Sequence, residues 1–274
     1  MSAAMGLPLS HWSFEGLSVG CRIGGAGLPL LLIHGSGPGA STIGNWRLVL
    51  EDLANRYHVH AMDLVGFGES DRKPAPPYFD FELWLRQCRA MIARMPGERI
   101  GIIGHSISGA LALRLAASEP RVAGVLATGT MGAPFALTEG TRLCWTYPET
   151  RADLLRAARA LIADEALIDE AYVAAREAVL RQSGYGAYFN TMFGGDKQAY
   201  IDAAVIPPAE LARITCPVTL LHGRADGGFP AEPLSLALAR HLPQADVVLL
   251  GGCSHSIAME RPGHLLDAAR RLFG

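Results

Sequence analysis

The chain alternates between short apolar runs and longer segments in which apolar side chains recur every three or four positions. A continuous apolar run is typical of a strand buried on both faces, as in a parallel sheet. We expect strands at residues 28–34, 57–64, 99–104, 122–130, 217–223 and 245–250, with an edge strand or hairpin at 12–23. Helical periodicity marks residues 45–56, 79–95, 107–116, 231–241 and the segment from about 262 onward. This alternation predicts an α/β fold, a mostly parallel sheet with helices on both faces.

Residues 132–212 break the alternation, because they show helical segments and many aromatic side chains but no strand signal. The stretch is too long for a simple crossover between two strands. We therefore expect a helical cap at 132–212, inserted into a core formed by residues 1–131 and 213–274. Some of its aromatic side chains should pack the cap onto the core, and others should line a pocket beneath it.

One strand-to-helix junction carries a candidate nucleophile. The apolar strand ends at Gly104, a helix begins at Ile107, and Ser106 lies at the corner. This layout is typical of a nucleophile elbow, which lifts the serine hydroxyl above the sheet and aims free helix N–H groups at it. The positions two before and two after the serine must be small, and Ser108 stands where glycine is usual. A register centred on Ser108, or an ordinary turn with a capping serine, is the alternative.

A serine nucleophile needs a base to take its proton and an acid to orient that base. In an elbow-containing fold these partners follow in the order serine, acid, histidine, each after a strand. Asp226 follows the strand at 217–223, and His255 follows the strand that ends at 250. We therefore expect Ser106, Asp226 and His255 to form a catalytic triad. Asp63 also ends a strand, but that strand precedes the elbow, so we expect Asp63 to hold the loop 65–70.

Seven of the nine histidines are better explained as surface residues or as hydrogen-bonded core residues than as bases. They are His11, His58, His60, His105, His222, His241 and His264.

The glycine-rich segment 34–39, His-Gly-Ser-Gly-Pro-Gly, allows two interpretations. It could be a dinucleotide-binding loop, since small residues follow a strand and Asp63 ends the next one. Pro38 argues against this, because proline has no N–H to offer a phosphate. It could instead be the oxyanion-hole loop of a hydrolase, with the backbone N–H groups of Ser36 and Ile107 as donors.

Composition narrows the classes of function. With 274 residues, half of them hydrophobic, the chain can bury a large core, and its net charge of −2 favours neither nucleic acid nor an anionic membrane as a partner. No apolar stretch reaches transmembrane length, and the N-terminus lacks the basic and apolar regions of a signal peptide. Five scattered cysteines without CxxC spacing fit a reduced, cytoplasmic compartment. Nothing in the sequence calls for a metal or an organic cofactor.

Together these motifs resemble the α/β-hydrolase superfamily, and more closely the meta-cleavage product hydrolases, the C–C bond hydrolases of aromatic degradation that include the 2-hydroxymuconic semialdehyde type. The likeness runs along nearly the whole chain. It rests on IHGSGPGA at 33–40 with Asn45-Trp46, DLVGFG at 63–68, Thr138-Glu139-Gly140, Trp145, Arg176, Met192-Phe193 and HGRAD at 222–226.

The resemblance implies an α/β-hydrolase fold with a cap, and a small-molecule substrate that carries a dienol and a carboxylate. In that family the dienol is ketonised, and serine or a serine-activated water then attacks the keto carbonyl. Arg176 would grip the carboxylate and the C2 oxygen, and Asn45 would contact the same end. The alternative interpretation of Arg176 is a solvated helix residue beside Glu177.

Two positions depart from the family pattern. His105 stands where asparagine usually precedes the nucleophile, and Ser256 stands where tryptophan usually follows the catalytic histidine. Both positions normally contact the dienoate, so we expect both here to bind substrate. The departures leave a carboxylesterase or lactonase open as an alternative function, and a non-catalytic ligand receptor as a third. Since dimers are common among similar proteins, a homodimer or higher homo-oligomer is also open.

Overall fold

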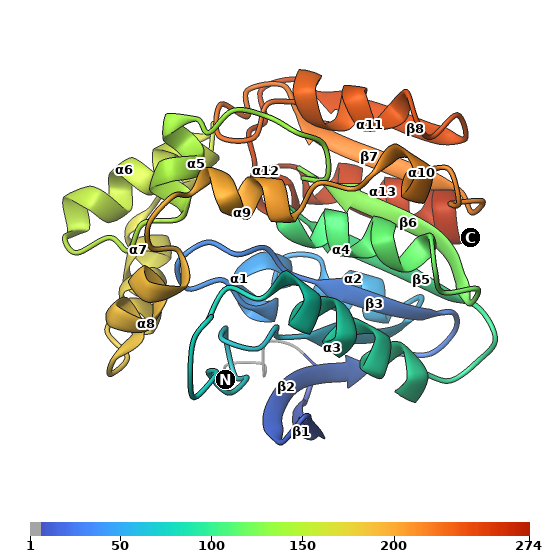
Figure 1. The fold of residues 1–274 in the computed structure, drawn as a ribbon, viewed down its shortest axis with the longest axis horizontal. Helices are drawn as coiled ribbons and strands as arrows, with labels where there is room; N and C mark the ends of the chain where they lie inside the picture. Colours follow the sequence, from blue (N-terminus) through green and yellow to red (C-terminus); the bar gives the residue numbers. More distant parts are fainter. Residues whose placement is uncertain (1–6) are drawn as a thin grey trace.

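The computed structural model describes residues 7–274. Its centre is one eight-stranded sheet with the strand order β1-β2-β4-β3-β5-β6-β7-β8 (Figure 1). The pairs β1–β2 and β2–β4 are antiparallel, and every other neighbouring pair is parallel. This confirms the expected mostly parallel sheet. The expected lack of a signal peptide rests in part on residues 1–6, which lie outside the described residues.

Each apolar run forms a strand; four strands are one to three residues shorter than their runs, β5 is shifted by one residue, and β8 matches its run. The strands are β1 Leu9–Phe14, β2 Leu17–Gly24, β3 Pro29–Ile33, β4 His58–Met62, β5 Ile100–His105, β6 Val122–Thr128, β7 Val218–Gly223 and β8 Ala245–Leu250. The edge element expected at 12–23 is the hairpin β1–β2, which begins earlier than predicted. β3, β5 and β7 are buried along their whole length, which explains their unbroken apolar sequences.

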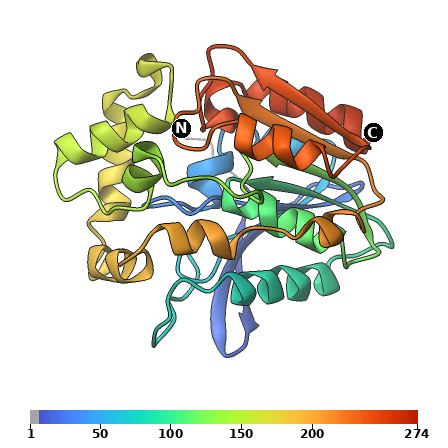
Figure 2. The same ribbon diagram turned by 45° about the horizontal axis from the view of Figure 1, so that its top comes forward.

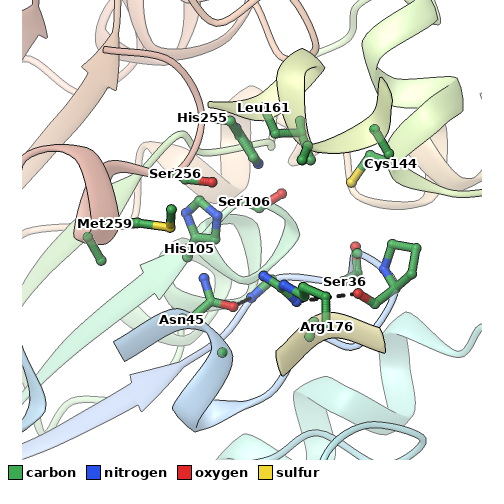
Figure 3. A pocket seen from close by; sticks show the side chains of 18 of the residues that line it. Ser36, Asn45, His105, Ser106, Cys144, Leu161, Arg176, His255, Ser256 and Met259 are labelled. Carbon is green, nitrogen blue, oxygen red and sulfur yellow. Dashed lines mark hydrogen bonds between the residues drawn. The ribbon is translucent and has the colours of Figure 1, made fainter. Parts of the chain in front are cut away.

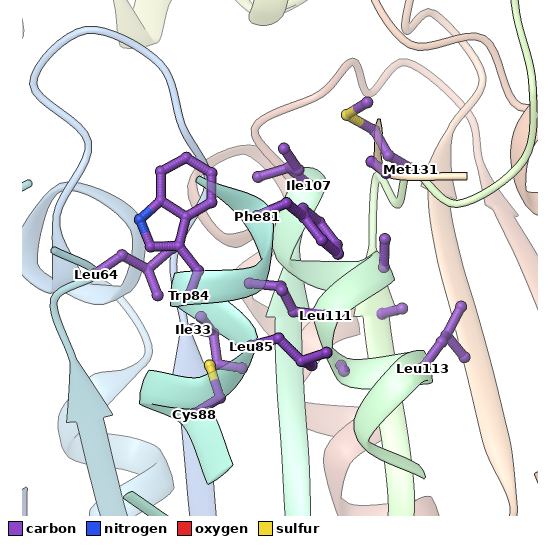
Figure 4. Close-up of a cluster of buried hydrophobic side chains, with 14 of the residues drawn as sticks. Ile33, Leu64, Phe81, Trp84, Leu85, Cys88, Ile107, Leu111, Leu113 and Met131 are labelled. Atoms are coloured by element: carbon purple, nitrogen blue, oxygen red, sulfur yellow. The ribbon is translucent and has the colours of Figure 1, made fainter. Parts of the chain in front are cut away.

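Helices cover both faces of the sheet. Those that pack on one face are α3 Phe81–Arg94, α4 Ile107–Ala116, the π-helical turn Glu232–Leu236 and α11 Ala237–Ala239; those on the other are α1 Thr42–Trp46, α2 Leu50–Ala54, α12 Ile257–Glu260 and α13 Pro262–Phe273. Figure 4 shows the first face, where Trp84, Leu85 and Leu111 pack over Ile33. None of the helices in residues 7–274 is long and apolar enough to cross a membrane.

Two expected helices are wrong in detail. The helix expected at 45–56 is divided between the end of α1 and the separate α2, because the chain turns at Val49 (φ −128°, ψ −10°) so that Trp46, Val49 and Leu53 all reach the same buried cluster. Residues 231–241 form a π-helical turn followed by a short α-helix, beginning where Pro233 removes a backbone N–H. Tertiary packing overrides regular periodicity in both cases.

The segment between β6 and β7 contains helices and no strand among its residues, all of which the structure describes. These are α5 Glu139–Cys144, α6 Arg151–Leu161, a 3₁₀ turn Glu165–Leu167, α7 Glu170–Leu180, α8 Tyr185–Met192, α9 Gln198–Ala203 and α10 Pro208–Leu211. Helices α5 to α8 stand to one side of the sheet (Figures 1 and 2). Residues 132–212, called the proposed cap below, place Trp145, Phe189 and Phe193 in the same apolar cluster as α3 and α4.

Candidate active site

Ser106 occupies the corner between β5 and α4 in a backbone conformation that is costly for a residue with a side chain. Its φ is 60° and its ψ is −126°. The corner is tight, because a Cβ atom at Gly104 would lie 2.3 Å from the carbonyl oxygen of Ser108. Ser108 itself lies in the first turn of α4, where its hydroxyl donates to the His34 carbonyl at 2.5 Å. The geometry of an elbow therefore centres on Ser106 rather than on Ser108.

Asp226 and His255 come together from the loops after β7 and β8. The Nδ1 atom of His255 lies 2.7 Å from Oδ2 of Asp226. Because a carboxylate only accepts hydrogen bonds, Nδ1 carries the proton and Nε2 keeps its lone pair. The Phe229 N–H donates to the other carboxylate oxygen at 2.8 Å. Both side chains are buried, so this pair is oriented and shielded from water.

The environment of Asp226 keeps it ionised. Burial would raise the pKa of Asp226, but its electrostatic interaction with His255 and hydrogen bonds from His222 and His255 hold that pKa well below its usual value. His222 is a second imidazole beside the carboxylate, with its Nε2 atom 3.4 Å from Oδ2 of Asp226. The same atom donates to the Phe229 carbonyl, and Nδ1 contacts the Ser235 hydroxyl. His222 is thus a hydrogen-bonded core residue, as expected.

The imidazole of His255 is held between two rings. Phe229 stacks on it at 4.2 Å between ring centroids, and His105 lies 4.6 Å away on a tilted plane. Gly129 (φ 52°) approaches so closely that a Cβ atom there would lie 2.9 Å from Nδ1 of His255. These contacts hold the imidazole in one orientation, as a general base requires.

The loop 34–39 is fixed from several sides. His34 donates through Nδ1 to the Gly35 carbonyl at 2.6 Å and accepts the Leu64 N–H at Nε2. Burial lowers the pKa of His34, so the imidazole stays neutral in this role. The Trp145 indole N–H, from the proposed cap, donates to the Ser36 hydroxyl at 3.0 Å. Ser36 lies in this loop, and Ile107 begins α4, whose first N–H groups have no partner within the helix.

Arg176 reaches the pocket from α7. Its Nη1 atom lies 3.1 Å from the Gly39 carbonyl and 3.4 Å from that of Pro38. The neighbouring Glu177 pairs with Arg181 instead, and no ion pair found among residues 7–274 includes Arg176. Arg176 is half-buried and lines the pocket, which favours substrate binding over the alternative of a solvated helix residue.

His105, Asn45 and Ser256 lie next to one another on one wall (Figure 3). The Nδ1 atom of His105 lies 3.0 Å from the carbonyl oxygen of Thr128, which can only accept, so Nδ1 carries the proton. Burial, and then the electrostatic interaction with His255, lower the pKa of His105 far enough to keep it neutral, leaving Nε2 as an acceptor. The Oδ1 atom of Asn45 accepts the Gly35 N–H at 3.4 Å, so its NH₂ group remains a donor.

One pocket unites most of the expected site residues. Ser106, His255, Ser36, Asn45, His105, Arg176 and Ser256 all line it, with Asp226 behind His255 and Ile107 behind Ser106. The proposed cap supplies the opposite wall, whose lining residues are Cys144, Pro148, Leu154, Ala157, Ala158, Leu161 and Tyr172. Among the described residues, no group of three or more His, Cys, Asp or Glu side chains could hold a metal ion.

Sequence reasoning missed the contacts that fix this site. The family resemblance includes Trp145 but says nothing of its hydrogen bond to Ser36, which joins residues 109 positions apart in the sequence. The Tyr185 hydroxyl accepts the Gly39 N–H at 2.6 Å across 146 residues. No local pattern marks such pairs; only the density of aromatic residues in 132–212 hinted that some would face the loop.

Asp63 and His60 give opposite outcomes. Asp63 accepts the N–H groups of Thr42 and Glu69 at 2.6 and 2.9 Å, which confirms its expected role in the loop 65–70. His60 is buried, but neither ring nitrogen has a hydrogen-bond partner among residues 7–274. The expectation of a surface or hydrogen-bonded histidine is wrong there, because His60 is paired with Ile23 and Leu31 and its ring meets, among the described residues, only the ring of His58, to which it makes no hydrogen bond.

The sequence pattern of the Alpha/beta hydrolase family matches residues 30–269. Similar characterised proteins include a 2-hydroxymuconate semialdehyde hydrolase from Pseudomonas sp. (strain CF600), 31% identical over 89% of this chain and 86% of that protein. A 2-hydroxy-6-oxo-2,4-heptadienoate hydrolase from Pseudomonas putida is 30% identical over 86% of each chain.

Solved structures agree with these relatives. A variant of the meta-cleavage product hydrolase CumD superposes with a TM-score of 0.91 at 28% identity, over 96% of this chain and 97% of that one. The 2-hydroxy-6-oxo-6-phenylhexa-2,4-dienoate hydrolase BphD from Rhodococcus sp. strain RHA1 gives 0.87 at 27% identity, over 97% and 99%.

Proposed function

The chain belongs to the alpha/beta hydrolase family, and we propose from that premise that it hydrolyses a C–C bond in a 2-hydroxy-6-oxohexa-2,4-dienoate-type meta-cleavage product. The similar proteins are hydrolases named for substrates of this class. The observation in this chain that carries the proposal is Arg176, a guanidinium that faces the pocket of Ser106 without an acidic partner among the described residues.

A half-buried guanidinium that has no acidic partner among the described residues favours an anionic ligand. Its planar fork matches a carboxylate with two parallel hydrogen bonds. The Asn45 NH₂ group beside it adds a neutral donor for the adjacent oxygen. A neutral ester would leave this cation unpaired, so the polar end of the pocket suits a dienoate better.

In the proposed reaction the ketonised substrate binds with its C6 carbonyl at Ser106. His255 takes a proton through Nε2 from the Ser106 hydroxyl, or from a water that Ser106 positions, and the oxygen attacks C6. The carbonyl electrons move onto oxygen, where the N–H groups of Ser36 and Ile107 stabilise the negative charge. Asp226 holds the imidazole during both proton transfers.

Collapse of this intermediate breaks the C5–C6 bond. The electron pair passes into the dienoate fragment, where Arg176 balances the charge, and a proton from His255 completes 2-hydroxypentadienoate. The other fragment leaves as a carboxylic acid, directly if water attacked C6 or after hydrolysis of an acyl group on Ser106. One substrate molecule and one water together thus supply all the atoms of the two products.

Arg176→Ala tests this assignment. Losing the charged hydrogen bonds to the carboxylate should lower kcat/KM for 2-hydroxymuconic semialdehyde about 100-fold or more. Turnover of a neutral p-nitrophenyl ester should change little, and Arg176→Lys should restore part of the dienoate activity. Loss of dienolate absorbance and release of p-nitrophenol measure the two reactions, with Ser106→Ala as the inactive control.

The carboxylesterase or lactonase alternative is favoured by Ser256, a small side chain beside His255 that leaves room in the pocket. Ester hydrolysis with untouched dienolate, at wild-type rates in Arg176→Ala, would replace the first proposal by this one. Full activity in Ser106→Ala would refute both.

Two further features extend the proposal. β8 is an edge strand that pairs only with β7 and exposes Val248 and Leu249, which supports association of two copies. All five cysteines are free, which supports a reducing cytoplasmic location.

A further inference from the structure

The proposed cap is hydrogen-bonded directly to the loop that carries the acid. The hydroxyls of Thr138 and Thr141, at the start of α5, both donate to the Gly228 carbonyl, at 2.9 and 2.5 Å. Packing there is tight, since a Cβ atom at Gly140 would lie 2.6 Å from the Cα of Gly228. Gly228 is two residues from Asp226, so α5 holds the loop that carries Asp226 in place.

A second attachment joins the cap to the histidine loop. The backbone N–H groups of His255 and Ser256 both donate to the carbonyl oxygen of Leu161, each at 3.1 Å. Leu161 is the last residue of α6, and its side chain also lines the pocket opposite Ser106 (Figure 3). The backbone of His255 is therefore bonded to the cap as well as to the core.

The side chain of Glu260 bonds to both sides of this attachment. Its Oε1 atom accepts the Ser254 N–H at 2.9 Å, and its Oε2 atom accepts the N–H groups of Ala163 and Asp164 at 2.8 and 3.3 Å. The side chain is buried, and no ion pair found among residues 7–274 includes it. One carboxylate thus joins the end of α6 to the residue before His255.

We propose that Glu260 is a positioning residue that couples the seating of the cap to the placement of the base His255. This rests on the proposed function, in which His255 is that base. Three consecutive amides, at residues 254, 255 and 256, donate either to Glu260 or to Leu161, so the cap fixes the backbone from which the imidazole extends. Small displacements of a catalytic group are costly in rate, which makes this attachment a determinant of kcat.

Through this attachment, a bound substrate can influence the position of His255. Leu154, Ala157 and Ala158 of α6 line the same pocket as Leu161. A ligand that contacts α6 therefore presses on the helix whose last carbonyl holds His255. Substrate binding against α6 and placement of the His255 imidazole are therefore coupled.

Two substitutions of Glu260 break the attachment to different extents. Glu260→Gln keeps the shape but offers only one acceptor oxygen, so it can serve one side of the attachment, and Glu260→Ala serves neither. We expect kcat to fall about 10-fold in Glu260→Gln and about 100-fold in Glu260→Ala, with KM within about twofold, since the imidazole is misplaced while the pocket remains. Asp153→Asn is the control, because it loosens the capping box at the other end of α6 without touching the histidine loop.

A spectroscopic readout separates positioning from stability. The far-downfield proton resonance of the His255–Asp226 hydrogen bond should broaden or vanish in Glu260→Gln, below its unfolding temperature, and persist in Asp153→Asn. Unchanged kcat and resonance in Glu260→Gln would overturn the inference. Equal losses in Glu260→Gln and Asp153→Asn at equal losses in Tm would also overturn it.

Wild-type hydrogen exchange tests the same coupling without a variant. The amides of Ala163, Ser254 and His255 should exchange with a common rate and become protected together when a carboxylate product fills the pocket; independent rates would contradict the coupling. His255→Ala distinguishes failure of the proposed function from failure of the proposed role of Glu260. If it remains active, the proposed function fails, whereas an inactive His255→Ala beside a fully active Glu260→Ala defeats only the role of Glu260.

Discussion

At the scale of single residues, the imidazole of His60 is buried in β4 with neither nitrogen bonded within residues 7–274. Burial and then the charge of His58 lower the pKa of His60 to about 4. An unfolded histidine has a pKa near 6.5. The unfolded chain therefore binds a proton that the folded chain resists, and stability present above pH 6.5 is lost as the pH falls toward 4.

We expect His60→Leu to reduce this acid sensitivity. The wild-type free energy of unfolding should fall by about 1–3 kcal/mol through His60 between pH 7 and pH 4.5, and the variant should lose that much less. His34 and His105, whose pKa values are also lowered, contribute with the same sign in both proteins. Urea unfolding at the two pH values measures the difference; parallel curves for wild type and variant would assign the acid sensitivity to other groups.

At the scale of elements, the hydroxyl of Ser108 joins the first turn of α4 to the end of β3 by its bond to the His34 carbonyl. Ser108→Ala leaves that buried carbonyl with one acceptor site unfilled and should cost about 1–2 kcal/mol of stability. The elbow itself should remain, because alanine fits where serine fits. Thermal unfolding measures the loss, and a Tm equal to that of the wild type would show that the bond contributes nothing net.

Strands were easier to predict than helices for a physical reason. A strand such as β5 is buried on both faces, so its sequence is apolar without interruption and its limits are visible. The segment 45–56 shows helical spacing, but the chain bends at Val49 to bury Trp46 and Leu53 in one cluster. That bend depends on the partners beneath it, which a local pattern does not contain.

The site divides in the same way. The proposed triad could be chosen from sequence because Ser106, Asp226 and His255 each follow a strand, and the carboxyl ends of parallel strands lie at one edge of the sheet. The supporting contacts could not, since Glu260 holds Ala163 across 97 residues and Trp145 holds Ser36 across 109. The neutral tautomer of His105 depends on the Thr128 carbonyl beside it in the sheet.

At the scale of the whole molecule, the free edge of β8 predicts self-association. Val248 and Leu249 are 39% and 38% exposed on a strand whose outer hydrogen-bonding groups are unpaired by another strand in the described sheet. A second copy placed antiparallel would satisfy those groups through a two-fold axis. We expect light scattering to give a dimer for the wild type and a monomer for Val248→Lys/Leu249→Lys, with kcat unchanged. A monomeric wild type would refute this interface.

The apolar cluster that the proposed cap shares with the sheet and its helices limits how this protein can be re-engineered. Trp145, Phe189 and Phe193 are fully or almost fully buried in the cluster that also contains α3 and α4. Excising residues 132–212 would therefore expose the floor of that cluster, and the remaining chain would tend to aggregate rather than act as a minimal enzyme. Exchanging caps between relatives to alter substrate range would require the threonines that hold Gly228, the residues at 161–164 and Glu260 to be exchanged as one unit. The proposed cap is in this sense not an exchangeable module, and new specificities are better sought by changing side chains on the pocket face of α6 and α7.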